Sequence, residues 1–395
     1  MQVLVLNSGS SSLKFQLFSM PEETILCSGL IERIGLDDGK FTFNTDKDSI
    51  EVVTSIPNHK VGLELLANQL LDPKTGIIKS ADDIDVVGHR VVHGGKYFSD
   101  TTEITQEVKE KINALSSLAP LHNPANLEGI EVAEAIFPNA KQVAVFDTAF
   151  HQSIPEKAYQ YAIPREFSEK HSIRLYGFHG TSHKYVSEKA IEFLGKTHSK
   201  IITIHLGNGC SMTAIKDGKS IDHSLGFSPV NGLIMGTRSG DIDQSIIFYL
   251  AKKYNYSLEE INTLLQKKSG MLGLTGFSDL RDIQSEAEKG NEACQLALDM
   301  NTYRIKKYIG SYAAILNGLD AIVFTAGIGE NSSVMREMVC KDLDFLGIEL
   351  NTEENNKRSD KIRAINTKDS RVNILVIPTN EELEIAKQAV DLFKN

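Results

Sequence analysis

The chain has 395 residues, and its 42 lysines and arginines against 52 aspartates and glutamates give a formal net charge of −10. This length predicts two or three domains, each able to bury a core of its own. A hydrophobic content of 41% with 24% charged residues excludes a disordered chain. An acidic chain without a basic block also excludes nucleic acid and anionic lipid as partners.

The cysteine and hydropathy patterns indicate where the protein works. The cysteines at positions 27, 210, 294 and 340 show no C-x-x-C spacing, which indicates reduced thiols. The first apolar run ends at Asn7, which makes it too short for a signal peptide. No run approaches the ~18 apolar residues of a membrane span. We therefore expect a cytoplasmic protein without a membrane partner.

A β-hairpin is predicted at the start of the chain. The apolar run Val3–Leu6 predicts a buried strand, and the small polar residues 7–12 predict a turn. Alternating apolar residues from position 13 to 17 then predict a returning strand. The same patterns predict strands at 24–30, 50–54, 85–92 and 142–146, and helices at 60–71 and 103–118.

The hairpin pattern recurs about 200 residues later. Residues 201–204 form an apolar run, 207–209 a Gly/Asn turn and 212–215 a returning strand, which indicates a duplicated domain core. Beyond it we expect a strand at 321–324, a turn at 327–331, a long helix at 291–316, a strand at 372–377 and a helix at 380–393. The predicted domains are 1–149 with 382–395, and 150–381.

Three turns have the composition of an anion-binding loop. They lie at 7–12, 207–211 and 327–331, each directly after an apolar strand, and combine Gly with Ser or Asn. Standard nucleotide motifs are absent, because Gly218-Lys219-Ser220 lacks the first P-loop glycine and no G-x-G-x-x-G occurs. A nucleotide bound here therefore requires another fold.

Six blocks of the sequence resemble the acetokinase family, in its order and spacing. They are Asn7-Ser8-Gly9-Ser10-Ser11-Ser12-Leu13-Lys14, Val86-Val87-Gly88-His89-Arg90-Val91-Val92-His93-Gly94-Gly95, Asp147-Thr148-Ala149-Phe150-His151, Gly177-Phe178-His179-Gly180-Thr181-Ser182-His183, His205-Leu206-Gly207-Asn208-Gly209 and Met235-Gly236-Thr237-Arg238-Ser239-Gly240-Asp241. The resemblance implies an α/β fold with two duplicated ribonuclease-H-like domains, of the sugar kinase, Hsp70 and actin type, around a central cleft. It also implies a C-terminal nucleotide-binding domain and a homodimer. Local departures occur at Gln244, Ala326 and Asn380, where the family usually has Pro, Gly and Asp.

The resemblance also implies a reaction, the reversible in-line transfer of the ATP γ-phosphoryl group to acetate. Arg90 would hold the acetate carboxylate, while Arg238 and His179 would contact the transferring phosphoryl group. Planar guanidinium groups suit both anions. The family reading makes Asp147 a proton acceptor, but a small carboxylic acid is already ionised at pH 7. Asp147 as an organiser of Mg²⁺, water or Arg90 stays open as the alternative.

Further site residues are implied in the same way. Asn7 and Glu381 match the family's Mg²⁺ positions, with Mn²⁺ also possible, because oxygen donors suit such ions. The expected nucleotide-binding residues are Ser10, Ser12, Lys14, His205, Leu206, Gly207, Asn208, Gly209, Asp279, Leu280, Arg281, Gly327, Ile328, Gly329, Glu330 and Asn331. The expected carboxylate pocket comprises Arg90, Val92, Leu121, His122, Phe178 and Pro229.

Three alternatives to this reading differ in class. A propionate or other short-chain carboxylate kinase would share every motif, since one methylene changes binding by only about 1–3 kcal/mol. A non-enzymatic nucleotide-binding relative of actin or Hsp70 would need neither Arg90 nor the His179 block. An inactive relative is disfavoured because Arg90, Asp147 and His179 stand in full motif context.

Overall fold

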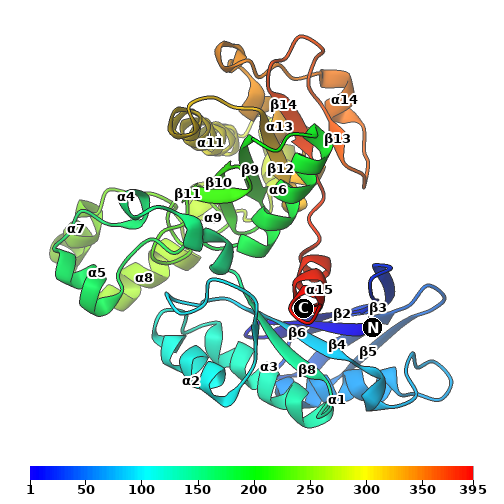
Figure 1. The fold of residues 1–395 in the computed structure, drawn as a ribbon. Coiled ribbons are helices and arrows are strands. Elements are labelled where there is room, and N and C mark those ends of the chain that lie inside the picture. Colours follow the sequence, from blue (N-terminus) through cyan, green and yellow to red (C-terminus); the bar gives the residue numbers. More distant parts are fainter. Residues whose placement is uncertain (395) are drawn as a thin grey trace. The chain divides into compact units, whose positions relative to one another are not determined.

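The computed structural model describes residues 1–394, which form two compact units (Figure 1). Unit 1 contains Met1–Gln152 and the chain from Asn380 onward, and unit 2 contains Ser153–Thr379. The boundaries lie within three residues of those expected, although residue 395 is outside the described part. Glu381 belongs to unit 1, not to the C-terminal domain where the sequence analysis placed it.

Unit 1 is built on an eight-stranded mixed sheet. Its strands are β1 (Gln2–Ser8), β2 (Ser12–Ser19), β3 (Thr24–Glu32), β4 (Leu36–Asn44), β5 (Ser49–Ile56), β6 (Val86–Val91), β7 (Thr102–Glu103) and β8 (Lys141–Phe146). Their order is β5-β4-β3-β2-β1-β6-β8-β7. The hairpin β1–β2 is antiparallel, whereas β1, β6 and β8 are parallel neighbours.

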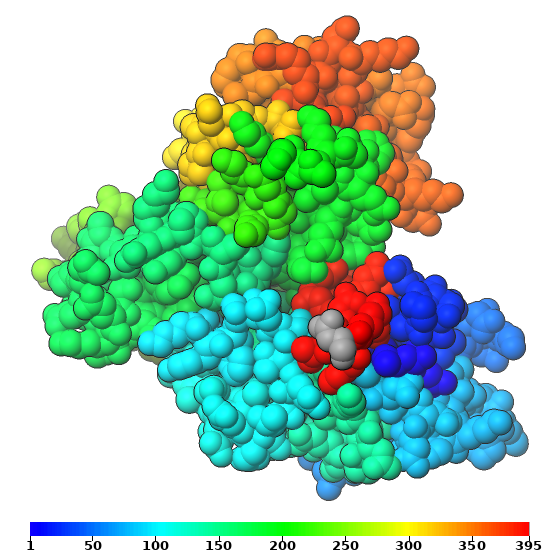
Figure 2. Space-filling model, viewed as in Figure 1, coloured from blue at the N-terminus to red at the C-terminus, as the bar shows by residue number. Residues whose placement is uncertain are grey.

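Four α-helices belong to unit 1: α1 (His59–Leu70), α2 (Gln106–Ala114), α3 (Asn123–Ile136) and α15 (Glu381–Asp391). The C-terminal helix α15 packs on β1, β6 and β8 through an apolar face that includes Leu383 and Ile385. In the space-filling view this segment (red) lies directly against N-terminal residues (blue; Figure 2). Asn380 caps it by accepting the Leu383 N–H at 3.0 Å.

Unit 2 repeats the central topology of unit 1 with a different sequence. Its strands are β9 (Lys200–Leu206), β10 (Cys210–Lys216), β11 (Lys219–His223), β12 (Ala321–Thr325), β13 (Arg363–Ala364) and β14 (Asn373–Val376), in the order β11-β10-β9-β12-β14-β13. As in unit 1, an antiparallel hairpin is followed by parallel neighbours, here β9, β12 and β14. The order β3-β2-β1-β6-β8 thus corresponds to β11-β10-β9-β12-β14, and the predicted duplication is a feature of the fold.

The helices of unit 2 are more numerous than those of unit 1. They are α4 (Glu156–Tyr159), α5 (Arg165–His171), α6 (Gly180–Leu194), α7 (Ser245–Tyr254), α8 (Leu258–Lys267), α9 (Gly270–Thr275), α10 (Leu280–Glu288), α11 (Glu292–Leu316), α12 (Ala326–Asn331), α13 (Ser333–Cys340) and α14 (Thr352–Asn356). Helix α6 packs on β9 and β12, and α11 packs on β9 and β10. Among residues 1–394, no helix is both long and apolar enough to cross a bilayer.

Two local predictions are wrong. Residues 327–331, expected as a turn, lie in helix α12, which the buried Arg336 side chain stabilises by donating to the Gly329 and Glu330 carbonyls at 2.8 and 2.9 Å. The helix expected over 103–118 is shorter, because Thr105 caps α2 through the Val108 N–H and the preceding residues pair with β8. Both differences are caused by contacts with residues outside the predicted segment, which the local composition cannot predict.

Candidate active site

The parallel strands of unit 1 bring Arg90 and Asp147 together. Arg90 is the fifth residue of β6, and Asp147 directly follows the neighbouring strand β8. The Arg90 guanidinium donates from Nε to Asp147 Oδ1 at 3.0 Å and from Nη2 to Asp147 Oδ2, a bidentate pair. Asp147 is 1% exposed along its side chain and Arg90 19%, so solvent screens the pair weakly.

Asn7 completes this cluster from the end of β1. Its side-chain oxygen accepts from Arg90 Nη1 at 3.1 Å. The guanidinium therefore contacts both residues, which come from β1 and from the end of β8, the two strands that flank β6. Burial alone would lower the pKa of Arg90, but the Asp147 and Glu381 carboxylates outweigh it and hold the pKa above its ordinary value.

Two glutamates at the start of α15 add negative charge to the same region of unit 1. Burial, with the Asp147 and Glu382 carboxylates, raises the pKa of Glu381 to about 7. Glu382 forms an ion pair with Lys14, in which Lys14 Nζ lies 2.8 Å from Glu382 Oε1. Lys14, expected to reach a nucleotide phosphate, is thus paired with Glu382 in the structure.

The donor set in unit 1 fits a divalent cation. Asn7, Asp147 and Glu381 supply hard oxygen ligands, the type that Mg²⁺ prefers. The pKa of Glu381 is raised chiefly by burial and further by the Asp147 and Glu382 carboxylates, and a cation bound beside it would favour its ionised form. Among residues 1–394, no group of three or more His, Cys, Asp or Glu side chains is arranged to hold a metal ion.

Sequence reasoning missed the residues that hold the first polar turn in place. His59 Nε2 lies 2.7 Å from the Gly9 carbonyl, and Asn126 donates to the Ser8 carbonyl at 2.7 Å. Asn126 also accepts the Val92 N–H at 3.1 Å, which links the ends of β1 and β6. Ser10 is exposed in this turn and Ser12 is half-buried. These supporting residues lie in helices, where their spacing gives no functional signal.

In unit 2, His179 and Arg238 meet at the turn between β9 and β10. A side chain at Gly209 would place its Cβ 3.4 Å from His179 Cε1 and 3.7 Å from Arg238 Nη1. His179 adopts a left-handed backbone with φ of 57° immediately before α6. The pKa of Arg238 is lowered by burial, and its Nη1 donates to the Pro229 carbonyl at 2.8 Å. The glycine thus permits the two predicted phosphoryl ligands to approach one backbone turn.

The loop that carries Arg238 is closed by Asp241, which sequence reasoning did not assign. Asp241 accepts the Gly232 N–H at 2.7 Å, and Asp241 N–H donates to the Gly232 carbonyl at 3.1 Å. Helix α11 holds this carboxylate through Tyr308 Oη at 2.7 Å. The only sequence feature that pointed to Asp241 was the family-like block 235–241, of which it is the last residue.

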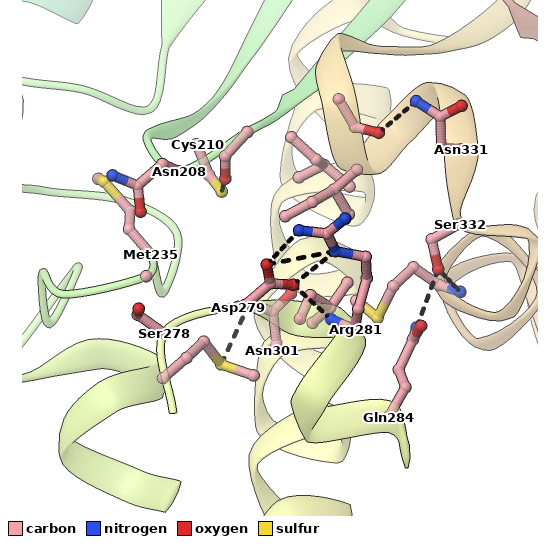
Figure 3. A pocket seen from close by; sticks show the side chains of 18 of the residues that line it. Asn208, Cys210, Met235, Ser278, Asp279, Arg281, Gln284, Asn301, Asn331 and Ser332 are labelled. Carbon is pink, nitrogen blue, oxygen red and sulfur yellow. Dashed lines mark hydrogen bonds and ion pairs between the residues drawn. The ribbon is translucent and has the colours of Figure 1, made fainter. Parts of the chain in front are cut away.

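A pocket of about 840 Å³ lies beside this turn, wholly within unit 2. Nine residues expected at the nucleotide line it: Leu206, Gly207, Asn208, Asp279, Leu280, Arg281, Gly327, Ile328 and Asn331. In Figure 3, Asn208 and Met235 lie on one wall and Asn331 and Ser332 on the opposite one, with the Asp279–Arg281 ion pair between them. The pocket thus combines glycine-rich backbone with a polar rim.

The apolar part of the pocket was not predicted. Ile234, Met235 and Met271 line it, with Ser278, Asn301 and Gln284 as further polar groups. Their contacts are long-range, since Asn301 on α11 donates to the Ile234 carbonyl at 3.1 Å. An apolar wall with a few polar groups suits a heteroaromatic base.

Four expected nucleotide residues in unit 2 are not part of the pocket lining. His205 is buried and bonds to Ser182 at 2.9 Å, and Glu330 accepts the Thr379 N–H at 3.0 Å. Gly209 lies against His179, and Gly329 lies in α12 against Phe324. Burial raises the pKa of Glu330 and so disfavours its ionised form, a cost that the hydrogen bond from the Thr379 N–H partly offsets.

The expected carboxylate pocket divides between the two units. Val92, Leu121 and His122 belong to unit 1, and Phe178 and Pro229 to unit 2. Val92 and Phe178 are buried, whereas Leu121 is 60% exposed. His122 immediately precedes helix α3 as its cap residue. Neither unit contains all of these residues, so the expected carboxylate pocket stays a prediction.

The comparisons with known proteins place this duplicated α/β fold in a family. The acetokinase family matches residues 2–387. A protein from Flavobacterium johnsoniae named acetate kinase is 64% identical over 395 residues, covering 100% of both chains. The chain therefore belongs to the acetokinase family.

Solved structures agree closely with this fold. Porphyromonas gingivalis acetate kinase superposes with a TM-score of 0.95 at 46% identity, covering 100% of both chains. A propionate kinase from Francisella tularensis gives 0.93 at 45% identity and 99% coverage of each chain. Both similarities extend over the two units and the C-terminal helix.

Proposed function

We propose that this protein is an acetate kinase, which transfers the ATP γ-phosphoryl group reversibly to acetate and forms acetyl phosphate and ADP. The observation that carries the proposal is the full-length 64% identity to a protein of that name. The structure supports it with a buried arginine–carboxylate cluster in unit 1 and a base-sized pocket in unit 2. Phosphoryl transfer needs positioning and charge neutralisation more than covalent help from the protein.

Within this proposal the two units have separate tasks. In unit 1, Arg90 binds the acceptor carboxylate, and Asp147 orients the guanidinium, since both Asp147 oxygens accept from it. Asn7 and Glu381 hold the divalent cation, which we take to be Mg²⁺ and which neutralises phosphate charge. In unit 2, the pocket takes the adenine nucleotide, and His179 and Arg238 contact the phosphoryl group from the Gly209 turn.

A hydroxamate-trapping assay tests the activity. The protein is incubated with ATP, Mg²⁺, hydroxylamine and each linear carboxylate from formate to butyrate, and acyl hydroxamate is measured. We expect the highest kcat/KM with acetate. Arg90→Ala, purified in parallel, controls for a contaminating kinase. Absence of hydroxamate with every carboxylate would overturn the proposal.

Propionate kinase is the second candidate, and one observation keeps it in view. The two solved structures named for acetate and propionate kinases match this chain almost equally, at 46% and 45% identity. A pocket that discriminates one methylene contributes only about 1–3 kcal/mol, or 10- to 200-fold. A higher kcat/KM for propionate than for acetate in the same assay would establish this alternative.

We also propose that the protein is a homodimer and works in the cytoplasm. Helix α7 has no buried residue, and it exposes Ile246, Phe248 and Tyr249 by 43, 63 and 58%. An exposed apolar helix face of this kind marks a protein-interaction surface, and a second copy of this chain is the partner we favour. Light scattering should give twice the 43.6 kDa chain mass, and Phe248→Glu should give monomers.

The proposed cytoplasmic location is supported by the cysteines. All four are free and buried, as expected in a reducing compartment.

A further inference from the structure

A buried layer of hydroxyl and imidazole groups lies between helix α6 and the sheet of unit 2. The register pairs Ser211 on β10 with His205 on β9, and Thr213 with Thr203, so these four side chains share one face. The intervening residues Met212 and Ile204 are apolar and point to the other face. From α6, His183 contributes a ring that is fully buried.

Ser211 connects the edge of this layer to its interior. Its hydroxyl lies 2.9 Å from His179 Nδ1 and 2.7 Å from His183 Nε2. His183 Nδ1 lies in turn 2.7 Å from Thr203 Oγ1. The result is a continuous chain of hydrogen bonds from Thr203 through His183 and Ser211 to His179.

The two nitrogens of His179 face different surroundings. Nδ1 points to Ser211, while the Cε1–Nε2 edge lies against the Gly209 turn, where Arg238 Nη1 also approaches. The ring stacks on His205 at a centroid distance of 4.4 Å. Helical spacing explains the arrangement, because residues 179 and 183 lie one turn apart at the start of α6.

A serine hydroxyl has one proton and two acceptor lone pairs, so it donates to at most one of the two imidazole nitrogens. If His179 Nδ1 is unprotonated, Ser211 donates to it, and His183 Nε2 must carry a proton to keep its own hydrogen bond. If His183 Nε2 is unprotonated, Ser211 donates to it, and His179 Nδ1 carries a proton. The two nitrogens therefore cannot both be unprotonated while both hydrogen bonds persist, which couples the proton positions of the two rings.

We propose that Ser211 is a positioning residue, which fixes the ring orientation and the proton position of His179 and couples both to His183. This inference rests on the proposed function for its catalytic consequence. A neutral His179 that donates from Nε2 to a phosphoryl oxygen requires Ser211 to donate to Nδ1. An imidazolium His179 is also accommodated, because Ser211 then accepts from Nδ1 and donates to His183. Arg238, His183 and His205 are the titratable groups that face His179, and His223 packs edge-on against His183 at 5.2 Å.

The first test is kinetic. Ser211→Ala removes the bridging hydroxyl, and removal of a hydrogen bond that orients a functional histidine typically lowers activity about 10- to 100-fold. We expect this loss in kcat, with the KM values for ATP and acetate changed less than about threefold. Ser187→Ala, at a fully buried serine of helix α6 whose hydroxyl donates to Lys184 O at 2.9 Å, is the matched control and should retain wild-type kcat.

A double variant separates positioning from general structure. In a His179→Ala background, Ser211→Ala should lower kcat no further, because Ser211 acts through the His179 ring. An equal loss in both backgrounds, or wild-type kcat in Ser211→Ala, would overturn the inference.

The second test needs no activity, so it stays informative if the proposed function fails or Ser211→Ala does not fold. The protein has 11 histidines, and nitrogen-15 labelling of them reports which ring nitrogens carry protons. In the wild-type protein we expect titration of His179 to shift the His183 Nε2 resonance, and Ser211→Ala to abolish that shift. Independent titration of the two rings in the wild-type protein would refute the coupling.

Discussion

Units 1 and 2 share a strand order but use the ends of their central strands differently. In unit 1, the strands β1, β6 and β8 end in charged or amide groups that pair with each other, such as Arg90 with Asp147. In unit 2, the corresponding region after β9 offers backbone at Gly207 and Gly209 and hydroxyl and imidazole groups in place of carboxylates. One topology thus supports a charge-paired site and a backbone-lined pocket.

This difference indicates how two units with the same topology can bind different ligands. A buried ion pair holds one guanidinium in a fixed orientation, which suits a small carboxylate. A glycine-rich turn with an apolar wall suits a large nucleotide, which needs space and N–H donors more than a fixed charge. Variants in unit 1 should therefore change kcat and the response to carboxylate, and variants in the pocket should change the response to ATP.

The largest effect is expected at Arg90. Arg90→Ala removes the guanidinium that Asp147 and Asn7 orient, and we expect kcat/KM for acetate to fall at least ~10²- to 10³-fold, the usual loss for a positioned electrostatic contact. Arg165→Ala, at an exposed arginine paired with Glu169 on α5, should leave kcat/KM within twofold of wild type. The hydroxamate assay measures both. A similar loss in the two variants would show that charge alone, without position, explains the result.

A smaller effect is expected from Asp147→Asn. The amide keeps the shape but leaves the Arg90 charge without its bidentate partner, so kcat should fall about 10- to 100-fold. The free energy of unfolding should fall by about 3 kcal/mol, as when one partner of a buried ion pair is removed. Urea denaturation and steady-state kinetics provide the two values, with the surface variant Asp299→Asn as control. Near-wild-type turnover would remove Asp147 from the mechanism.

The pocket should respond differently. Arg281 is exposed at the pocket rim and forms an ion pair with Asp279. We expect Arg281→Ala to raise the KM for ATP about 3- to 10-fold, because a rim contact contributes modestly, while the KM for acetate stays unchanged. Arg358→Ala at the same rim provides a comparison. If the KM for acetate rose as much as that for ATP, the assignment of separate tasks to the units would be wrong.

No effect on activity, only a pH-dependent effect on stability, is expected at a buried carboxylate of unit 2. Burial raises the pKa of Asp222 to about 6 from 3.8. The folded state therefore binds this proton more tightly than the unfolded state, and the ionised group destabilises the fold above about pH 6. Asp222→Asn should be more stable than wild type by about 1–3 kcal/mol at pH 8.

That advantage should shrink as the pH falls from about 6 towards 3.8, where the wild-type side chain is also neutral. Unfolding midpoints measured for both proteins between pH 4 and 8 supply the comparison. A stability difference that does not change with pH would show that Asp222 is not destabilised by its burial, in contrast to the ion-paired Asp147 of unit 1.

Local patterns predicted the hairpins and the strand ends well. The alternation at 13–17 and the long helix near 291–316 correspond to β2 and α11. The strand-terminal positions of Arg90 and Asp147 follow from two apolar runs that pair in parallel. Where neighbouring residues in the sequence determine the structure, periodicity and turn chemistry were sufficient.

Long-range contacts explain what the sequence did not reveal. Helix α12 replaces a predicted turn because Arg336 binds its carbonyls, and Met235 reaches the pocket only through the folding of the loop up to Asp241. The layer around Ser211 combines β9, β10 and α6, and no single segment contains its pattern. Glu381 was assigned to the wrong domain because the expected boundary between 381 and 382 lies one residue inside α15, although the return of residues 382–395 to unit 1 was predicted.

That return of α15 has a consequence for the order of synthesis on the ribosome. Gly88 on β6 lies so close to this helix that an added Cβ would be 2.9 Å from Ile385, so α15 is an integral layer of unit 1. Yet it is translated after all of unit 2, which ends at Thr379. At about 5–20 residues per second, the first sheet waits on the order of 10–50 s for its cover. A nascent chain thus has no Glu381, one of the two proposed metal ligands, until the last moments of translation. A premature stop before residue 381 produces a nearly full-length chain that lacks both this ligand and the α15 layer of unit 1.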